Sequence, residues 1–247
     1  MFSLSRRALL AGSGATALLT ACPLCAAGSP FVVKNVLCAA RALGGQTVDE
    51  IFKTTGDAVL DNGLISEMLT QSAFYGLRPA FALYDAPEKN AFATPDVLPD
   101  YPGTDGTICY HLQWLRDQLK SSQWGGLILA GVIAHEFGHI YQFKTAYYRT
   151  LLGYDRTTKF VELHADFLSG FYLGGKFAHI DMKDYADYAY RIGDSNFTEV
   201  THHGTPPERY LATKAGFNLR LGNQSLGVAN AAREGDAFLK EYIHATP

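Results

Sequence analysis

Positions 135–139 carry the motif HEFGH, in which two histidines and a glutamate lie close together in the chain. They continue an apolar run over 127–134 that contains no proline, which predicts a buried helix. On a helix, His135 and His139 lie one turn apart on one face, so their ring nitrogens can meet at a single metal ion. Glu136 lies beside that face, where its carboxylate can take a proton from a water that the metal activates. This pattern predicts a zinc hydrolase with Glu136 as general base.

A third ligand is needed, because hydrolytic zinc takes three protein ligands and keeps a fourth position for water. The segment VELHADFLSG supplies Glu162 and Asp166, which share one face of a second predicted helix. We expect Glu162 to ligate the same zinc ion, one per chain, and Asp166 to accept the second ring N–H of a ligand histidine. His164 points about 200° away from Glu162 on this helix, which favours a polar partner over a ligand. Gly138 and Ala165 are small enough to let the two helices approach closely.

Both helices have an alternative interpretation. HEFGH could be a solvated helix face with two neutral histidines, and the second segment could be an exposed acidic face. Apolar neighbours, among them Leu163, Phe167 and Phe171, favour burial of the second helix, as the apolar run does for the first. A buried set of histidines and carboxylates requires partners or a metal, because desolvation of these groups is costly.

Together the two motifs resemble the gluzincin arrangement, in which HExxH is joined by ExxxD on a second helix. The form ExxAD followed by FLSG most resembles the bacterial neutral zinc metallopeptidases, and it is also similar to peptidases of the CaaX-prenyl-protease type. The stretch NAFA, at 90–93, is similar to one that those families carry upstream, and 107–112 falls where they carry the edge strand of the active-site sheet. The resemblance implies an α+β, mostly α domain with a small active-site sheet, and a peptide substrate that adds to this edge strand.

The segment THHGTPPER, at 201–209, resembles the C-terminal His-Gly or His-Pro segment of these families. The resemblance implies that His203 is catalytic and donates to the oxyanion of the reaction, with Tyr190 and Arg209 as further candidates. The doubled histidine leaves open whether His202 or His203 faces the site. Alternatively, His203 caps the helix that is expected to follow.

The N-terminus has the features of a targeting segment, which we assign to residues 1–27. Arg6 and Arg7 precede an uncharged apolar stretch whose roughly 14 residues would span about 21 Å as a helix, short of a bilayer core of about 30 Å. This favours a signal peptide over a membrane anchor, and the twin arginine resembles a Tat signal. Cleavage is expected at Cys22, which would then carry a lipid, or after Ala27. We expect an exported, periplasmic protein, attached to a membrane only through a lipidated Cys22.

The remaining residues, 28–247, have the length of a single domain. They retain Cys38 and Cys109, which could form a disulfide in an oxidising compartment or remain two buried thiols. The net charge of the full chain is −3, and loss of Arg6 and Arg7 would make it more negative. Because the sequence has no basic run, nucleic acid is not an expected partner. The expected partner is a peptide or protein substrate.

The elements expected along the chain are mostly helices. Residues 29–76 carry apolar residues at helical spacing, 80–84 predict a short strand, and the proline-rich stretch 87–106 predicts a loop around NAFA. Further helices are expected at 111–121, 125–145, 158–173, 183–192, 206–221 and 230–243.

The function that these observations favour is that of a zinc-dependent endopeptidase of the cell envelope. Two alternatives remain: a zinc-stabilised envelope protein that binds without catalysis, and a hydrolase of another amide, such as one in cell-wall material. The intact Glu136 favours catalysis, because a purely structural site needs no base and normally closes its fourth position.

Overall fold

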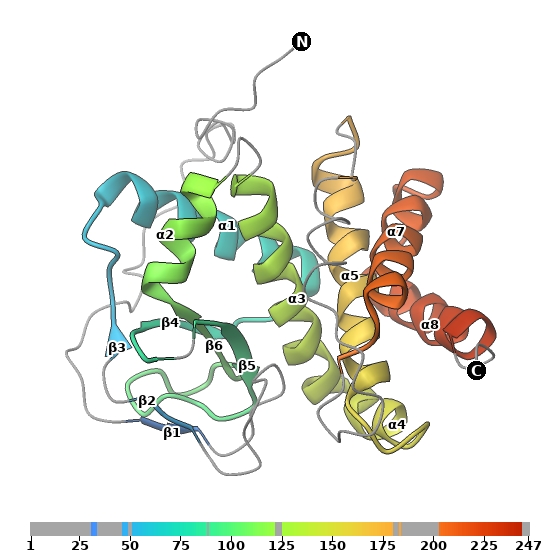
Figure 1. Cartoon of the computed structure of the whole chain (residues 1–247), viewed down its shortest axis with the longest axis horizontal. Helices are drawn as coiled ribbons and strands as arrows, with labels where there is room; N and C mark the ends of the chain where they lie inside the picture. The colour runs from blue at the N-terminus through green and yellow to red at the C-terminus, as the bar shows by residue number, and fades with distance from the viewer. Residues whose placement is uncertain are drawn as a thin grey trace. The chain divides into compact units, whose positions relative to one another are not determined.

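The structure is a computed structural model of the whole chain, and it is an α+β protein made mostly of helices, as predicted (Figure 1). The chain divides into two compact units, residues 1–129 and 130–247. The single domain that the length predicts stays a prediction. The structure describes residues 31–33, 46–48, 51–87, 89–121, 125–179, 183 and 203–243.

Several predictions concern residues outside these ranges. They are the signal segment 1–27 with its cleavage at Cys22 or Ala27, the pairing partner Cys38, almost all of the helix at 183–192, and the histidine and tyrosine candidates His202 and Tyr190. Each of these stays a prediction. Among the described residues, no helix combines the length and the apolar character needed to span a bilayer.

The first unit contains a mixed four-stranded sheet. Its strands lie in the order β3-β4-β6-β5, in which β4 and β6 are parallel and the outer pairs are antiparallel. The strands are β3 Ile51–Phe52, β4 Ala80–Tyr84, β5 Ala91–Thr94 and β6 Thr107–His111. A separate antiparallel pair is formed by β1 Phe31–Val33 and β2 Gln46–Val48.

The expectation that the strand near 107–112 lies at an edge is wrong. β6 has β4 on one side and β5 on the other, so its backbone groups are paired along both sides and cannot accept a substrate strand. The edges of the sheet are β3 and β5. The NAFA stretch, expected within a loop, forms the buried strand β5 because Ala91–Thr94 pair in register with Tyr110–Thr107.

One face of the sheet packs a small apolar cluster. Side chains alternate along a strand, so Ala80, Ala82 and Tyr84 of β4 share a face, and all three are buried in this cluster. Cys109 lies in register with Ala82 and Phe92 on the two neighbouring strands, and both of these residues belong to the same cluster. The sheet is therefore held by apolar packing around Cys109.

The helical prediction for 29–76 holds only in its second part. Helix α1, Ala58–Tyr75, begins where the Asp57 side chain accepts hydrogen bonds from Val59 N and Leu60 N, and it ends at Gly76, whose φ of 66° suits glycine. Before it, β1, β2 and β3 replace the expected helix. Their β-branched and aromatic residues favour strands when a pairing partner is present, and tertiary pairing overrides the weak helical spacing. Helix α2, Leu112–Ser121, follows β6 directly.

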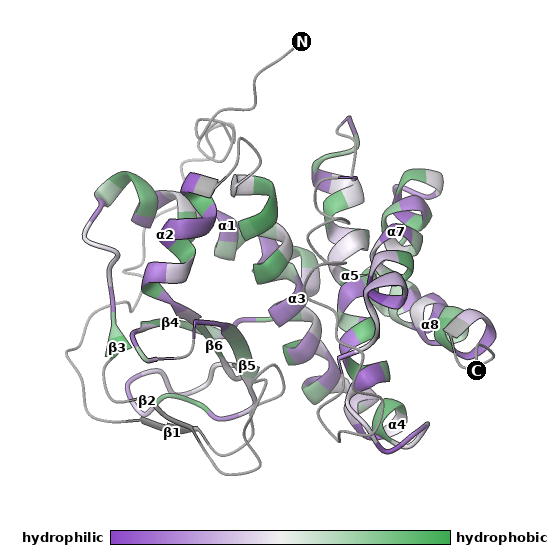
Figure 2. Cartoon of the chain, viewed as in Figure 1, coloured by the Kyte–Doolittle hydropathy of each residue, from purple (hydrophilic) through white to green (hydrophobic). Residues whose placement is uncertain are grey.

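The second unit is helical in all of its described elements, close to the predicted bounds. Its elements are α3 Gly125–Thr145, which begins in the first unit, α4 Tyr147–Leu152, α5 Lys159–Lys176, α7 Pro206–Gly222, α8 Val228–Phe238 and the π-helical turn η1 Leu239–Ile243. In Figure 2 the hydrophobic turns of α3 are interrupted by a hydrophilic band, as the position of HEFGH in the apolar run requires.

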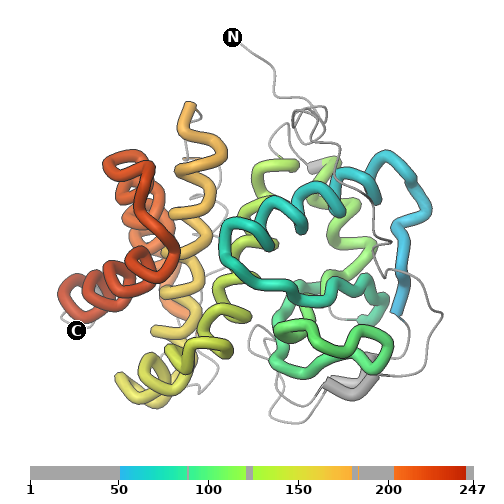
Figure 3. Tube along the Cα trace, turned by 180° about the vertical axis from the view of Figure 1, so that it is seen from behind, coloured from blue at the N-terminus to red at the C-terminus, as the bar shows by residue number. Residues whose placement is uncertain are grey.

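Helices α5 and α7 run side by side at very short range (Figures 1 and 3). A Cβ on Gly170 of α5 would lie 1.9 Å from the backbone oxygen of Thr213, and a Cβ on Gly216 of α7 would lie 1.9 Å from that of Phe167. Only glycine allows backbones to approach this closely. The two glycines therefore fix the position of α7, which carries Arg209, against α5, which carries Glu162 and Asp166.

Candidate metal centre

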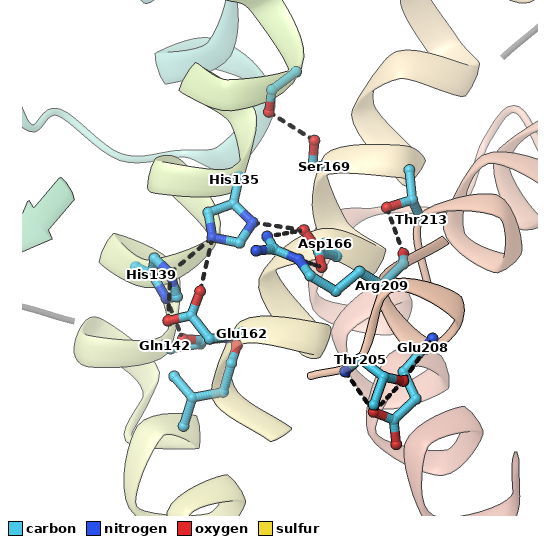
Figure 4. A network of polar contacts seen from close by, with 12 residues as sticks. His135, His139, Gln142, Glu162, Asp166, Ser169, Thr205, Glu208, Arg209 and Thr213 are labelled. Carbon is cyan, nitrogen blue, oxygen red and sulfur yellow. Dashed lines mark hydrogen bonds and ion pairs between the residues drawn. The ribbon is translucent and has the colours of Figure 1, made fainter. Parts of the chain in front are cut away.

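Helix α3 presents two of the predicted ligands on one face. The Nε2 atoms of His135 and His139 lie 3.0 Å apart, so the two rings direct their outer nitrogens to the same place. Both side chains are buried. Figure 4 shows the rings meeting the carboxylate of Glu162 from the neighbouring helix α5.

Glu162, in the first turn of α5, completes the group. Its Oε2 lies 3.3 Å from Nε2 of His135, and its Oε1 lies 3.5 Å from Nε2 of His139. One ligand atom from each of the three residues lies within 4.8 Å of the others. The three ligands predicted from the sequence thus meet at one point, and this buried group could hold a metal ion.

The inner nitrogen of His135 is held by Asp166, one turn after Glu162 on α5. Its Nδ1 lies 2.9 Å from Oδ1 of Asp166, the contact expected from the ExxxD spacing. Arg209 of α7 donates to the same carboxylate twice, from Nε to Oδ2 at 2.8 Å and from Nη2 to Oδ1 at 2.9 Å. Arg209 was a candidate for the oxyanion donor. Its guanidinium instead pairs with Asp166, a role that the sequence analysis missed.

The inner nitrogen of His139 is held by Gln142, which the sequence analysis also missed. Nδ1 of His139 lies 3.0 Å from Oε1 of Gln142, and Nε2 of Gln142 donates to the backbone oxygen of Val161 at 2.8 Å. The same Nε2 lies 3.2 Å from Nδ1 of His164, whose Nε2 lies 2.9 Å from the backbone oxygen of Ala232. The available signal was spacing, because Gln142 lies three residues after His139 on the same helix face. His164 is a polar partner outside the ligand group, as expected.

These contacts fix which ring nitrogens carry protons. Since both Nδ1 atoms face oxygen acceptors, on Asp166 and Gln142, both donate. When the rings of His135 and His139 are neutral, as metal ligands must be, both Nε2 atoms carry lone pairs. These lone pairs face one another and the carboxylate of Glu162, an arrangement that a cation at their meeting point stabilises.

Electrostatics at the centre also favour a cation. Burial alone would lower the pKa of His135, but the carboxylates of Asp166 and Glu162 raise it to about 10. Burial opposes ionisation of Glu162, yet His139, His135 and His203 hold its pKa well below the usual value. Burial likewise opposes ionisation of Asp166, whose pKa is nevertheless lowered by Arg209 and His135. Positive charge is thus favoured where the two histidines meet.

Glu136, the predicted base, is buried beside the ligands with an exposed fraction of 1%. Burial raises the pKa of its carboxyl group, while the neighbouring His135 and His139 act to lower it. Among the described residues, its Oε2 has no hydrogen-bond partner. A buried carboxylate oxygen without a partner is costly in free energy, and such groups mark functional sites or an unfilled ligand position.

The residues present fit a divalent metal. Zinc accepts two histidine nitrogens and one carboxylate oxygen, and Zn–N bonds of 2.0–2.1 Å would set the two Nε2 atoms about 3.3 Å apart, close to the observed 3.0 Å. The net charge of the group also suits a divalent cation. Because Arg209 balances Asp166, the charges left at the centre are those of Glu162 and Glu136, which a divalent cation would neutralise.

The close approach of α3 and α5 is explained by two small residues, as the sequence predicts. A Cβ on Gly138 would lie 3.1 Å from Cα and 3.2 Å from Cβ of Ala165. Ser169 joins the same two helices through a hydrogen bond of 2.7 Å to the backbone oxygen of Gly131. The ligand-bearing helices are therefore in contact at Gly138, between the two histidines in the chain, and at Gly131, one turn before His135.

His203 precedes α7 and is half-buried. It lies near enough to Glu162 to lower the pKa of that carboxyl group. The alternative role of His203 as the helix cap is wrong, because Thr205 is the N-cap and forms a capping box with Glu208. Thr205 forms the N-cap because its short hydroxyl side chain accepts a hydrogen bond from the backbone N–H of Glu208.

Comparisons with known proteins identify no relative of this chain. Scans against models of known families, against curated proteins and against solved structures all returned no match.

Proposed function

We propose that this protein is a zinc-dependent endopeptidase with a gluzincin-like catalytic domain. The observation that carries the proposal is the convergence of His135, His139 and Glu162 beside a buried carboxylate oxygen of Glu136 that has no hydrogen-bond partner among the described residues. A structural zinc site has no use for such a base. The proposed fold and peptidase class rest in addition on the resemblance of HExxH and ExxAD to those motifs in neutral zinc metallopeptidases.

A zinc ion held by these three ligands would supply Lewis acidity, which activates water and polarises a carbonyl group. Glu136 takes the proton of the attacking water as general base. It then passes this proton to the leaving amine as the C–N bond breaks. The raised pKa of Glu136 suits both steps, because a carboxyl group with a pKa nearer neutrality can both accept and return a proton.

His203 is the proposed oxyanion donor. It lies before the α7 capping box, and its effect on the pKa of Glu162, a proposed ligand, supports a position near the centre. With Arg209 engaged by Asp166, the ring of His203 is the remaining described candidate from the predicted set. A donor aimed at the developing negative charge contributes a large share of such catalysis.

A second function is favoured by burial. The ligands and Glu136 are all exposed by 4% or less, so the described residues leave them little access to a peptide. A metal enclosed in this way would suit a zinc-stabilised protein that binds a partner in the cell envelope without catalysis. Export, by a Tat-like signal with or without a lipid on Cys22, belongs to both proposals.

The test is incubation of residues 28–247 with a mixed peptide library, read by mass spectrometry, beside the Glu136→Gln variant. We expect cleavage by the first protein only, with one zinc per chain in both. Zinc in both without cleavage by either would refute the peptidase. In that case, turnover of muropeptides would identify an amide hydrolase of cell-wall material, and loss of folding on chelation alone would identify the metal-stabilised binding protein.

A further inference from the structure

The amide of Gln142 lies at a junction of three hydrogen-bonding groups. Its oxygen accepts from His139 at 3.0 Å, and its nitrogen donates to the backbone oxygen of Val161 at 2.8 Å. The nitrogen also faces Nδ1 of His164 at 3.2 Å. The side chains of Gln142, His139 and His164 are fully buried, so water does not compete for these contacts. The position of Gln142 beside His139 is visible in Figure 4.

The orientation of this amide is decided by groups remote from the metal centre. The backbone oxygen of Val161 can only accept, so it requires the NH₂ end of Gln142. His164 requires the same end, because its Nε2 donates to the backbone oxygen of Ala232 and its Nδ1 is therefore an acceptor. Both neighbours thus direct the amide oxygen of Gln142 towards His139.

A flipped amide would have consequences for the ligand. The NH₂ end would then face Nδ1 of His139, which would have to accept, and the ring proton would move to Nε2. A protonated Nε2 has no lone pair for a metal. The flipped oxygen would also face the backbone oxygen of Val161 with no proton between them.

We propose that Gln142 is a positioning residue that keeps His139 in the tautomer able to bind the metal, with His164 and the Ala232 carbonyl of α8 fixing its amide. The proposal rests on the metal centre of the proposed function and deepens it. It links the C-terminal helix α8 to the second histidine ligand through four groups in contact: Ala232, His164, Gln142 and His139.

The experiment compares zinc affinity, by chelator competition, in the wild-type chain and two variants. Gln142→Leu removes the acceptor at nearly constant volume, and we expect zinc affinity to fall about 10- to 100-fold, the range for loss of a group that orients a metal ligand. Ser169→Ala removes a buried hydrogen bond between the same two helices and is expected to keep the wild-type affinity.

The outcomes separate the two proposals. If the wild-type chain binds no zinc, the metal centre itself is refuted. If the wild-type chain binds zinc and Gln142→Leu binds it equally well, the positioning role is refuted while the metal centre stands. An equal fall in Gln142→Leu and Ser169→Ala would also refute the role, because the loss would then follow from any broken hydrogen bond between the two helices.

A second measurement needs no variant that could fail to fold. Nitrogen-15 NMR of the zinc-free chain reports which ring nitrogen of each histidine carries the proton. We expect His139 protonated at Nδ1 and His164 protonated at Nε2. A His139 ring that is neutral and protonated at Nε2 would overturn the proposal.

Discussion

The two histidine ligands are supported by opposite means. His135 is held by what we call the charged arm, the ion pair of Asp166 with Arg209 from α7. His139 is held by what we call the neutral arm. In this arm Gln142 contacts His139 and His164, and His164 donates to the backbone oxygen of Ala232 in α8. Both arms are buried, and both give the ring an oxygen acceptor at about the same distance.

The difference shows how two histidine ligands of one centre can both be oriented while only one of them has a charged partner. A carboxylate makes a ligand histidine more basic, but a buried carboxylate needs a cation, which Arg209 supplies. A second charged arm would place another carboxylate and another cation in a centre that already contains Glu162 and Glu136. An amide directs the ring proton without adding charge. The charged arm should therefore matter most for stability, and the neutral arm for the ligand tautomer.

The strongest test of this comparison removes the cation of the charged arm. Arg209→Met leaves Asp166 buried without its guanidinium partner, and breaking a buried pair on one side costs about 3–5 kcal/mol. We expect that loss in the free energy of unfolding of the zinc-free chain, measured by urea denaturation. The matched control is Lys159→Met, which breaks a more exposed contact of 3.5 Å to Glu208 and should cost about 1 kcal/mol or less. Equal losses in the two variants would show that the charged arm has no special role.

The next test displaces the helix that carries Arg209. In Gly170→Ala the new methyl group would meet the backbone oxygen of Thr213, and such overpacking costs about 1–3 kcal/mol or more. Because α7 must shift, zinc affinity should fall together with stability. Gly222→Ala, at the end of α7, meets nothing within 4 Å and should change neither quantity. A stable Gly170→Ala variant would mean that α5 and α7 are not packed as described.

A smaller effect on zinc affinity is expected when the charged arm loses the charge of its carboxylate. Asp166→Asn keeps an oxygen acceptor for His135 but leaves the buried Arg209 cation without its counter-ion, so this variant should also lose stability. We expect zinc affinity to fall about tenfold, at the low end of the range for groups that orient ligands. Chelator competition measures this fall. An affinity equal to that of the wild type would mean that hydrogen bonding alone, and not charge, supports His135.

The smallest effect concerns the start of α7. Thr205→Ala removes the N-cap hydroxyl and the capping box with Glu208, which should cost about 1 kcal/mol of stability. Arg209 lies one turn into the helix, so zinc affinity should stay near the wild-type value. Thermal unfolding and chelator competition on one sample check both statements. A large loss of zinc affinity would show that the charged arm depends on the cap.

The parts of the site that local spacing determines could be predicted from the sequence. HExxH and ExxxD each place their residues on one helix face. The need of a hydrolytic zinc ion for a third ligand and for a partner of the ligand histidine then predicted the contacts of Glu162 and Asp166 across the two helices. Helices α3, α5, α7 and α8 also followed from the period of a helix, whereas the short helix α4 was not predicted. The close packing of Gly138 on Ala165 followed from their size.

The parts that depend on contacts between distant segments could not be predicted. The residues around Arg209 do not indicate that it pairs with Asp166. Those around Gln142 do not indicate that it contacts Val161 and His164. The same limit explains the errors in the sheet. Strand order depends on pairings between distant segments, so the central place of β6 was not visible in its own residues. The strands before α1 are too short for the alternation of apolar and polar residues to be recognised, so the helical spacing of apolar residues dominated the prediction.

The central claim is that His135, His139 and Glu162 hold one divalent metal ion. The most direct measurement is the zinc content of the metal-stripped chain after equilibrium dialysis against zinc, beside the Glu162→Gln and Glu136→Gln variants. We expect one tightly bound zinc per chain in the wild type and in Glu136→Gln, and a large loss of zinc in Glu162→Gln. No bound zinc in the wild type, or full binding in Glu162→Gln, would contradict this claim.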